Sequence, residues 1–275
     1  MPVIKGLEWT FDTVAKEFDR WSPTYNSELY KDLFAYKEIN MNSNVLEIGI
    51  GTGQATVPIL RTGCNLTAVE LGKNLAEFTR NKFKEYKNFS VKNMAFQDFC
   101  AESSSFDMIY SAGAFHWIPE ELGYEKVFDM LKPGGVFARC TIHPYYRNNN
   151  RQEKLFDDIQ KAYKLHYNPI YHPADPSEIF HEYSAEQAEA RAQISLKYGF
   201  TDIAFKMYYR ERTYAAEDYT SLISIYSDHI ALPKSNRVAL CNDIKKAINA
   251  HGGNIVLRDV IDIEMARKPS DRTAI

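Results

Sequence analysis

Residues 45–54, VLEIGIGTGQ, decide how this chain folds. An apolar run containing Val45, Leu46 and Ile48 leads into glycines at positions 49, 51 and 53, and a helical pattern follows. Glycine is needed where the backbone takes a positive φ, or where a ligand lies against the main chain with no Cβ between them. The stretch therefore predicts a strand, a glycine turn that binds a ligand, and a helix.

The residues around this turn exclude two common ligand motifs. A dinucleotide fingerprint GxGxxG would need glycine at position 54 or 56, where the chain has Gln54 and Thr56. A phosphate-binding P-loop is also excluded, because no GK[ST] follows the turn. Glu47, just before the turn, disfavours a pyrophosphate as the main anchor and favours a cationic or zwitterionic ligand.

Two acidic residues after the glycine turn indicate a nucleoside. Glu70 ends the next predicted strand, 21 residues after Gly49. A carboxylate at that place can accept hydrogen bonds from both hydroxyls of a ribose. Asp98 follows the third predicted strand, where it either accepts the amino group of an adenine or caps a helix.

Strand-like and helix-like segments alternate outward from the turn. Alternation of this kind predicts βαβ units, hence a doubly wound α/β fold with a mostly parallel sheet. Ahead of it, residues 8–36 predict two short helices separated by a turn at Ser22-Pro23, and Lys132-Pro133-Gly134-Gly135 predicts the turn that ends the last helix of the run. The strands are expected at 44–48, 66–70, about 89–95, 106–111 and 136–142, and the helices at about 53–62, 73–86 and 120–131.

The second half of the chain predicts more helix and one closing pair of strands. Two alternating segments, 200–214 and 255–263, fit an antiparallel pair on the same sheet. The helical segments are expected at 151–167, 184–197, 216–231 and 235–250.

Composition restricts the class of protein and its partners. The 275 residues are 45% hydrophobic and 25% charged, which is typical of a folded globular protein. The net charge of −3 and the lack of a basic block argue against nucleic acid as a partner. The four cysteines have no zinc-ligand spacing, and no metal requirement is expected. No signal peptide or membrane-length apolar run is found, so a cytoplasmic protein without membrane contact is expected.

Several segments together resemble the class I S-adenosylmethionine-dependent methyltransferases. They are VLEIGIGTGQ, TAVEL, AFQDF, FDMIYSAGAFHWI and LKPGG, and they occur in that family's order and spacing. The resemblance implies a Rossmann-like seven-stranded sheet whose last strand is antiparallel, with helical lid insertions. It also implies S-adenosylmethionine as cofactor and S-adenosylhomocysteine as product.

The resemblance further implies which residues bind the cofactor. Glu47, Gly49, Gly51 and Gly53 would surround its methionine portion, Glu70 would bind its ribose and Asp98 would lie near its adenine. Leu71 and Gln97 would be further cofactor-binding residues. The wall near the reacting methyl would come from Ser111, Ala112, Phe115, His116 and Trp117.

Two segments resemble a narrower branch that includes trans-aconitate methyltransferase. They are Ala114–Ile118 (AFHWI) and the N-terminal phrase that begins at Phe11-Asp12. The branch's usual arginine before proline is Ser22 here. That change puts the same carboxylate substrate in doubt.

The implied chemistry is direct displacement at the sulfonium methyl, which mainly requires alignment in a dry pocket. His116 is the tentative catalytic residue, either as a base for a hydroxyl or amine acceptor or as a wall that orients the donor. Arg147, Arg210 and Arg212 could bind an acid, although a surface role is commoner for each. The tentative substrate contacts are Tyr25, His143, Tyr145, Tyr146, Tyr226 and Ser227.

The expected organisation is a single methyltransferase domain over 1–275, with a small organic molecule as methyl acceptor. Two other functions stay open, namely methylation of tRNA or protein and a non-catalytic sensor of the cofactor. The place of an Asn/Asp-Pro-Pro-Tyr segment reads Ser111-Ala112-Gly113-Ala114, which favours the small molecule. Within the domain we expect an N-terminal helical cover (1–36), a cofactor-binding core (37–142), helical lid segments (143–198 and 215–253) and closing strands (199–214 and 254–268).

Overall fold

The computed structural model describes residues 4–145, 152–171 and 182–270. The chain forms two compact units, and each is described by itself. The core unit comprises residues 23–142, 184–208 and 261–275, and the helical unit comprises residues 1–22, 143–183 and 209–260. The expectation of one domain with its inner divisions stays a prediction.

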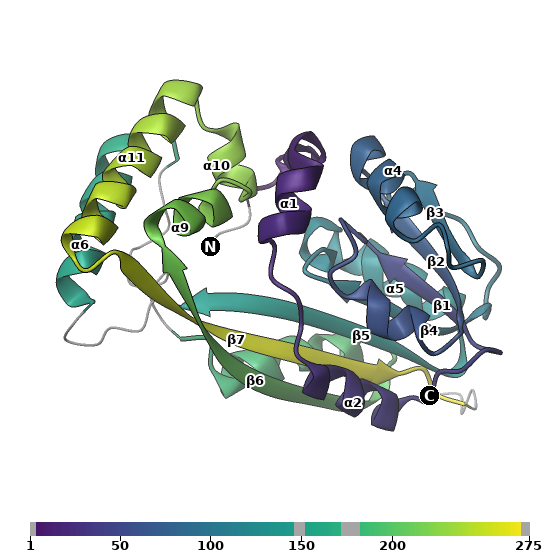
Figure 1. The fold of residues 1–275 in the computed structure, drawn as a ribbon. Coiled ribbons are helices and arrows are strands. Elements are labelled where there is room, and N and C mark those ends of the chain that lie inside the picture. The colour runs from purple at the N-terminus through teal and green to yellow at the C-terminus, as the bar shows by residue number, and fades with distance from the viewer. Residues whose placement is uncertain (1–3, 146–151, 172–181, 271–275) are drawn as a thin grey trace. The chain divides into compact units, whose positions relative to one another are not determined.

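A seven-stranded sheet organises the fold, in the order β3-β2-β1-β4-β5-β7-β6 (Figure 1). β1 to β5 are parallel where they pair, and β7 runs antiparallel. The predicted doubly wound α/β fold with an antiparallel last strand is therefore confirmed. The strands are β1 (Asn44–Ile48), β2 (Asn65–Glu70), β3 (Phe89–Asn93), β4 (Phe106–Ala112), β5 (Leu131–Tyr145), β6 (Thr201–Ala215) and β7 (Asn254–Arg267).

The strand order decides where a ligand can bind in the core unit. β1 pairs with β2 on one side and with β4 on the other, so the direction of winding reverses at β1. Ligands of open α/β sheets bind outside the carboxyl ends of the strands at such a reversal. The residues that follow Ile48, Glu70 and Ala112 are therefore the candidates for a binding site.

Helices cover both faces of the sheet in the core unit. Neighbouring residues of a strand point to opposite faces, so a strand that is apolar throughout needs a cover on each side. Val45 of β1 packs in a cluster with residues of α2 and α3. Leu46, the next residue, packs in a second cluster with residues of α5. The helical segments of this unit are α2 (Ser27–Tyr36), α3 (Thr56–Leu60), α4 (Lys73–Lys82), η2 (Phe115–Trp117), α5 (Glu120–Met130), α8 (Ala185–Gln193) and η3 (Ile194–Tyr198).

One turn expected from the sequence is wrong. The segment 132–135 was expected to end a helix with a turn. Helix α5 does end just before it, at Met130, but the segment itself lies inside β5, which starts at Leu131. Phe106 pairs with Leu131 while Met108 pairs with Val136, so the additional residues of β5 bulge out of the ladder. Gly134 takes φ +73 there, a conformation that glycine adopts without penalty.

The helical unit has a core of its own. Helix α11 packs against α6 and α9, and its residues Leu240 and Ile244 are fully buried. Within the described residues, no helix combines the length and the apolar composition needed to cross a bilayer. The helical segments of this unit are η1 (Glu8–Val14), α1 (Ala15–Trp21), α6 (Glu153–His166), α9 (Ala216–Ile223), α10 (Ser227–Ala231) and α11 (Lys234–Ala250).

Candidate active site

The glycine turn after β1 has the backbone geometry that its sequence predicts. Gly49, Gly51 and Gly53 take φ values of +70, +58 and +84. The Gly49 N–H donates to the Val69 carbonyl at 2.8 Å, and the Gly53 N–H donates to the Ile50 carbonyl at 2.9 Å. The first bond extends the β1–β2 ladder past the strand end and the second closes the turn, so the turn is tied to the end of β2.

Two of these glycines are also required by close packing within the protein. A Cβ on Gly49 would lie 2.3 Å from the Cβ of Ala114, and one on Gly53 would lie 2.5 Å from the Phe83 ring. Real Cβ atoms do not approach so closely. The turn therefore needs glycine for its own packing, and that packing brings the segment after β4 against the segment after β1.

Glu70 links the end of β2 to the glycine turn. Its carboxylate accepts the Gly51 N–H at 2.8 Å and the Gly72 N–H at 2.9 Å. The Asn93 side chain donates to the Glu70 carbonyl at 3.0 Å and so steadies the strand end. The two main-chain donors therefore fix the orientation of this buried carboxylate at the strand end.

Glu47 lies inside the core unit rather than at its surface. Its side chain is only 1% exposed and accepts a hydrogen bond of 2.8 Å from the Thr56 hydroxyl of α3. Burial raises its pKa to about 8, although the nearby Tyr110 hydroxyl and the hydrogen bond from Thr56 oppose the shift. The carboxyl group is therefore mostly neutral at pH 7, and it joins β1 to the helix behind the turn.

The segments after β2 and β3 expose apolar side chains. Leu71 is 48% exposed and Met94 is 38% exposed. Both directly follow a strand end, where the backbone pairs Met94 N–H with the Glu70 carbonyl at 3.0 Å. Gln97 and Asp98 are exposed a few residues further on. Met94 was not among the predicted site residues, although its place as an apolar residue immediately after a polar strand end is a signal that the sequence contains.

The segment after β4 divides into buried and accessible residues. Ser111 is buried and its hydroxyl donates to the Ile48 carbonyl at 2.9 Å, while the Phe115 ring packs in the core beneath the segment. Ala112 and Trp117 are half-buried and His116 is exposed, with 5.1 Å between the His116 and Trp117 rings. Of the wall residues expected from the sequence, Ser111 and Phe115 are therefore buried and hold the segment in place from the side of the core.

Tyr25 lies beside this same segment, within the core unit. Its hydroxyl is 3.6 Å from the position that a Cβ on Gly113 would occupy. Burial raises its pKa, and the neighbouring Cys140 thiol adds to the shift. Among the substrate residues predicted from the sequence, Tyr25 is the one that belongs to the core unit.

The other tentative substrate residues belong to the helical unit or fall outside the described residues. The His143 ring stacks on Tyr183 at 3.7 Å, and the Tyr226 ring lies 5.7 Å from that of His229. Tyr145 is half-buried, and Ser227 begins α10. Tyr146 and Arg147 lie outside the described residues. The roles of all these residues stay predictions.

Hydrogen bonds join a group of polar residues in the helical unit that the sequence analysis did not connect. Asp228 accepts a hydrogen bond from the Tyr167 hydroxyl at 2.6 Å and lies 2.9 Å from His229 Nδ1. His229 Nε2 lies 3.0 Å from the Tyr163 hydroxyl. Burial alone would raise the pKa of Asp228, but its hydrogen bonds to His229 and Tyr167 lower it overall. These contacts hold α10 against α6.

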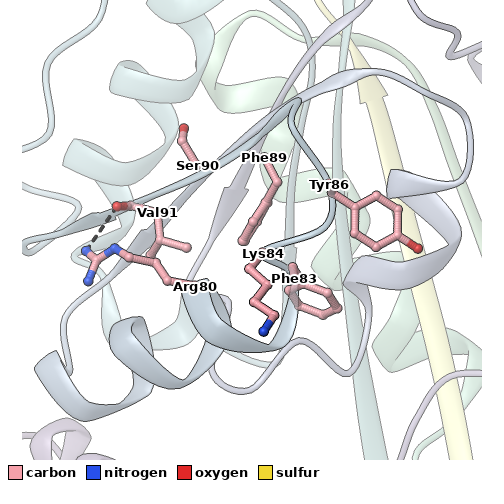
Figure 2. Close-up of a pocket in the computed structure, with 7 residues that line it drawn as sticks. All are labelled: Arg80, Phe83, Lys84, Tyr86, Phe89, Ser90 and Val91. Atoms are coloured by element: carbon pink, nitrogen blue, oxygen red, sulfur yellow. Dashed lines mark hydrogen bonds between the residues drawn. The ribbon is translucent and has the colours of Figure 1, made fainter.

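A small pocket lies elsewhere in the core unit, at the edge strand β3 (Figure 2). It has a volume of about 240 Å³, and the Arg80 guanidinium beside it donates to the Val91 carbonyl at 3.1 Å. None of the predicted site residues lines it. Its lining residues are Arg80, Phe83, Lys84, Tyr86, Phe89, Ser90 and Val91.

Comparison with known proteins places this geometry among methyltransferases. Residues 45–135 match the family model of a methyltransferase domain. An uncharacterised methyltransferase of Schizosaccharomyces pombe is 22% identical over 242 residues, which is 87% of each chain. An uncharacterised methyltransferase of Bacillus mycoides is 32% identical over 139 residues. That match covers 44% of this chain and 64% of the Bacillus protein.

A solved structure shares the fold. It is phosphoethanolamine N-methyltransferase 2 of Haemonchus contortus in complex with S-adenosyl-L-methionine. The TM-score is 0.54 at 16% identity, and the match covers 94% of this chain and 57% of the other.

Proposed function

Because the chain belongs to the class I S-adenosylmethionine-dependent methyltransferases, we propose that it methylates a small organic molecule at a carboxylate, hydroxyl or amine. The observation that carries this proposal is the junction of the glycine turn with Glu70. The 2.8 Å hydrogen bond from Gly51 to Glu70 holds a carboxylate at the strand end beside a backbone turn in the left-handed conformation. That combination suits a nucleoside whose ribose has both hydroxyls free.

The residues of the core unit fit the cofactor in kind. Glu70 would accept hydrogen bonds from the ribose hydroxyls, and the turn at Gly49–Gly53 would lie against the methionine portion. The exposed apolar side chains of Leu71 and Met94 would pack against the adenine, with Gln97 and Asp98 as its polar partners. Buried Glu47 would not touch the cofactor itself. It would hold the glycine turn in place through its hydrogen bond with Thr56.

The chain's own task in such a reaction is alignment and exclusion of water. S-adenosylmethionine supplies a methyl group that is activated by its bond to a sulfonium sulfur. When the methyl group is transferred, this sulfur becomes a neutral thioether. A carboxylate acceptor needs no base, whereas a hydroxyl or amine must give up a proton. Exposed His116 would take that proton or, with Trp117, orient the donor. The Tyr25 hydroxyl, next to Gly113, would contact the acceptor.

Charge and resemblance support a small acceptor. The net charge of −3 disfavours a nucleic-acid substrate. The Haemonchus structure is named for a small-molecule acceptor, phosphoethanolamine. The AFHWI segment resembles the trans-aconitate branch, which would make a carboxylate the acceptor, although Ser22 replaces that branch's arginine. His143, Tyr145, Tyr146, Tyr226 and Ser227 are proposed as further acceptor contacts, and the cytoplasm as the location.

Two measurements test the proposal in sequence. Isothermal titration with S-adenosylmethionine and S-adenosylhomocysteine asks whether the site binds both ligands. Methyl-labelled cofactor is then incubated with the enzyme and with metabolite, RNA and protein fractions. Label in the metabolite fraction is expected. Label confined to RNA or protein would establish a macromolecular acceptor, and binding without any labelling would establish a sensor.

A further inference from the structure

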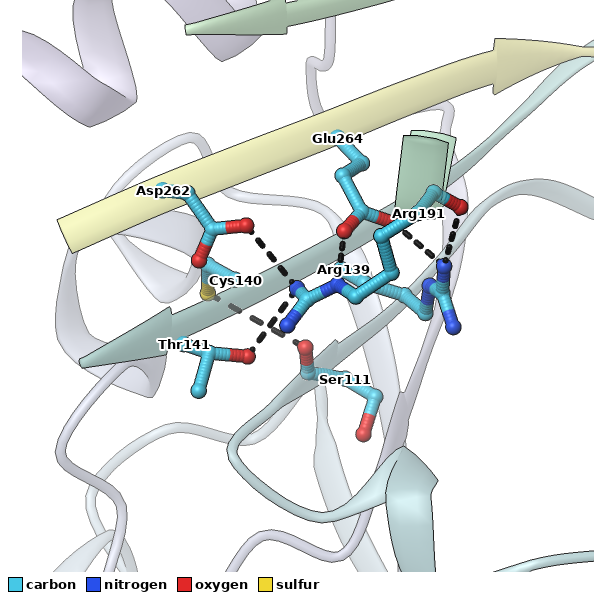
Figure 3. Close-up of polar contacts among 7 residues, drawn as sticks. All are labelled: Ser111, Arg139, Cys140, Thr141, Arg191, Asp262 and Glu264. Carbon is cyan, nitrogen blue, oxygen red and sulfur yellow. Dashed lines mark hydrogen bonds and ion pairs between the residues drawn. The ribbon is translucent and has the colours of Figure 1, made fainter. Parts of the chain in front are cut away.

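A buried ionic cluster lies in the core unit where β5, β7 and α8 meet (Figure 3). Glu264 of β7 forms ion pairs with both Arg139 of β5 and Arg191 of α8. Arg191 also lies 3.0 Å from Asp262 and donates to the Thr141 hydroxyl at 3.1 Å. The Arg139 guanidinium donates in addition to the Arg191 carbonyl at 3.1 Å. The side chains of Glu264 and Arg139 are 4% and 13% exposed, so the plane of the Arg139 guanidinium is held by buried contacts.

That guanidinium lies over two aromatic rings. Its Cζ lies 5.5 Å from the centre of the Phe115 ring and 5.1 Å from that of Tyr124. The Phe115 ring also lies 4.9 Å from the Phe137 ring, and a Cβ on Gly123 would lie 2.8 Å from its Cζ. Phe115 is therefore enclosed, with Arg139 as the one charged group against it among the contacts described.

Phe115 begins the short helix η2, which contains His116 and Trp117. The residue before it, Ala114, is the one that packs against Gly49. A displacement of the Phe115 ring would therefore move the accessible wall residues on one side and the contact with the glycine turn on the other.

We propose that Arg139 is a positioning residue for the cofactor site, acting through Phe115. Clamped by Glu264 and the Arg191 carbonyl, it fixes the Phe115 ring and with it the segment Ala114–Trp117. This inference rests on the proposed function, since it assigns Ala114–Trp117 to the cofactor site.

The role requires arginine rather than any cation. A guanidinium is planar, so it can stack on a ring and form hydrogen bonds along its edge at the same time. Lysine in its place would keep the positive charge near Glu264 but lose the stacking plane. The substitution Arg139→Lys therefore separates the positioning role from simple charge balance.

Arg267 supplies a matched control in the same unit. It lies 4.6 Å from the centre of the Tyr36 ring, pairs with Asp202 at 3.0 Å and donates to the Tyr36 carbonyl at 2.9 Å. It is the last residue of β7, which runs antiparallel to the other strands. Arg267 therefore lies near the amino-terminal ends of the parallel strands, whereas the glycine turn follows the carboxyl end of β1. Arg267→Lys removes the same kind of stacked, paired guanidinium away from the proposed cofactor site.

The test is titration of the full-length protein and both variants with S-adenosylhomocysteine, with thermal unfolding in parallel. Arg139→Lys should raise the Kd at least about 5-fold and Arg267→Lys less than about 2-fold. The loss of Tm should be larger for Arg139→Lys, because Arg139 pairs with buried Glu264 whereas Arg267 pairs with exposed Asp202. Equal Kd values for the two variants would overturn the inference. No binding by the unmodified protein would overturn the proposed function, and this inference with it, whereas normal binding by both variants would overturn the inference alone.

A second pair of variants covers the case in which Arg139→Lys does not fold. Phe115→Leu removes the ring beneath Arg139, and Phe128→Leu removes the ring that lies 4.9 Å from Lys268 Nζ. Phe115→Leu should raise the Kd for S-adenosylhomocysteine several-fold more than Phe128→Leu, and equal effects would overturn the inference. Where Arg139→Lys folds, adding it to Phe115→Leu should change the Kd less than about 2-fold, because both act through one contact. A full additional loss in the double variant would contradict action through Phe115.

Discussion

The glycine turn of the core unit and the Asp259 cluster of the helical unit hold their carboxylates in different ways. Around the glycine turn of the core unit, Glu70 is held by backbone N–H groups of Gly51 and Gly72 at a strand end. In the helical unit, fully buried Asp259 of β7 accepts hydrogen bonds from Arg210 at 2.8 Å and from Arg212 at 2.6 Å. The first carboxylate is fixed by main chain, and the second is paired with long side chains.

This difference separates binding from stability. Substitutions around the turn should change cofactor affinity, because main-chain geometry and one carboxylate make up the proposed site. Substitutions in the Asp259 cluster of the helical unit should change the free energy of unfolding, because Asp259 is fully buried and depends on its two partly buried arginine partners. Arg210 and Arg212 could have bound an acidic substrate on sequence grounds, but the structure pairs both of them with Asp259.

The largest effect should come from Asp259→Ala. Removing the buried partner of two guanidinium groups should lower the free energy of unfolding by about 3–5 kcal/mol, measured by chemical denaturation. The exposed Asp218→Ala of α9 is the control and should change it by less than about 0.5 kcal/mol. The Kd for S-adenosylhomocysteine should stay within about 2-fold of the unmodified value for folded Asp259→Ala. A large loss of affinity at unchanged stability would contradict the separation.

Gly49→Ala should follow, and it should affect both quantities. The new Cβ would face Ala114 at 2.3 Å in a left-handed backbone, so we expect a loss of about 2–4 kcal/mol in the free energy of unfolding and weaker binding of S-adenosylhomocysteine. Gly63→Ala isolates the backbone contribution, since its φ is +82 and its nearest neighbour would be at an ordinary 3.6 Å. It should cost about 1–2 kcal/mol and leave binding unchanged. Similar losses for both variants would show that packing against Ala114 adds nothing.

Glu70→Ala should weaken S-adenosylmethionine and S-adenosylhomocysteine by about 1.5–3 kcal/mol each, because charge-assisted hydrogen bonds to the ribose are lost. The comparison variant is Asp107→Ala, at the amino-terminal end of the central strand β4. Asp107 also accepts a backbone N–H beside a strand, that of Asn44 at 2.8 Å. Isothermal titration should find its affinities unchanged. Unaltered affinity in Glu70→Ala would remove the ribose contact from the proposed site.

The smallest effect is a pH dependence from Glu47. Burial raises its folded pKa to about 8, above the unfolded value of 4.5, so the folded state holds the proton more tightly. The resulting stability is fully present below the unfolded pKa and is lost as the pH rises through the folded pKa. Between roughly pH 6 and pH 7.5 the loss should be about 1–2 kcal/mol.

Glu47→Gln should remove that dependence while keeping an acceptor for the Thr56 hydroxyl. The measurement is the free energy of unfolding of both proteins across this pH range. Parallel curves for the two proteins would show that Glu47 titrates normally.

Local sequence patterns predicted most of the core unit. The strand at 44–48 has the predicted bounds, and those at 65–70 and 106–112 differ by one residue, because apolar runs bounded by polar residues mark buried parallel strands. The bulge at 132–135 was missed because a proline and two glycines normally end a helix, and only the pairing with β4 keeps them in a strand. Met94 was missed although its place directly after the polar end of β3 is a local signal. The Tyr163–His229–Asp228 contacts were missed because long-range hydrogen bonds leave no local pattern.

The sequence by itself was enough to predict the glycines with positive φ and the acidic residue at the end of β2. Backbone conformation and strand ends depend mainly on neighbours along the chain. Only the tertiary structure decided that Glu47 is buried and mostly neutral, that Phe115 supports its segment from beneath, and that Arg139 meets Glu264, 125 residues away. Burial and ion pairing depend on what the sheet order brings together in space. The same acidic or aromatic residue can therefore bind a ligand or hold the core, and its place in the sheet determines which.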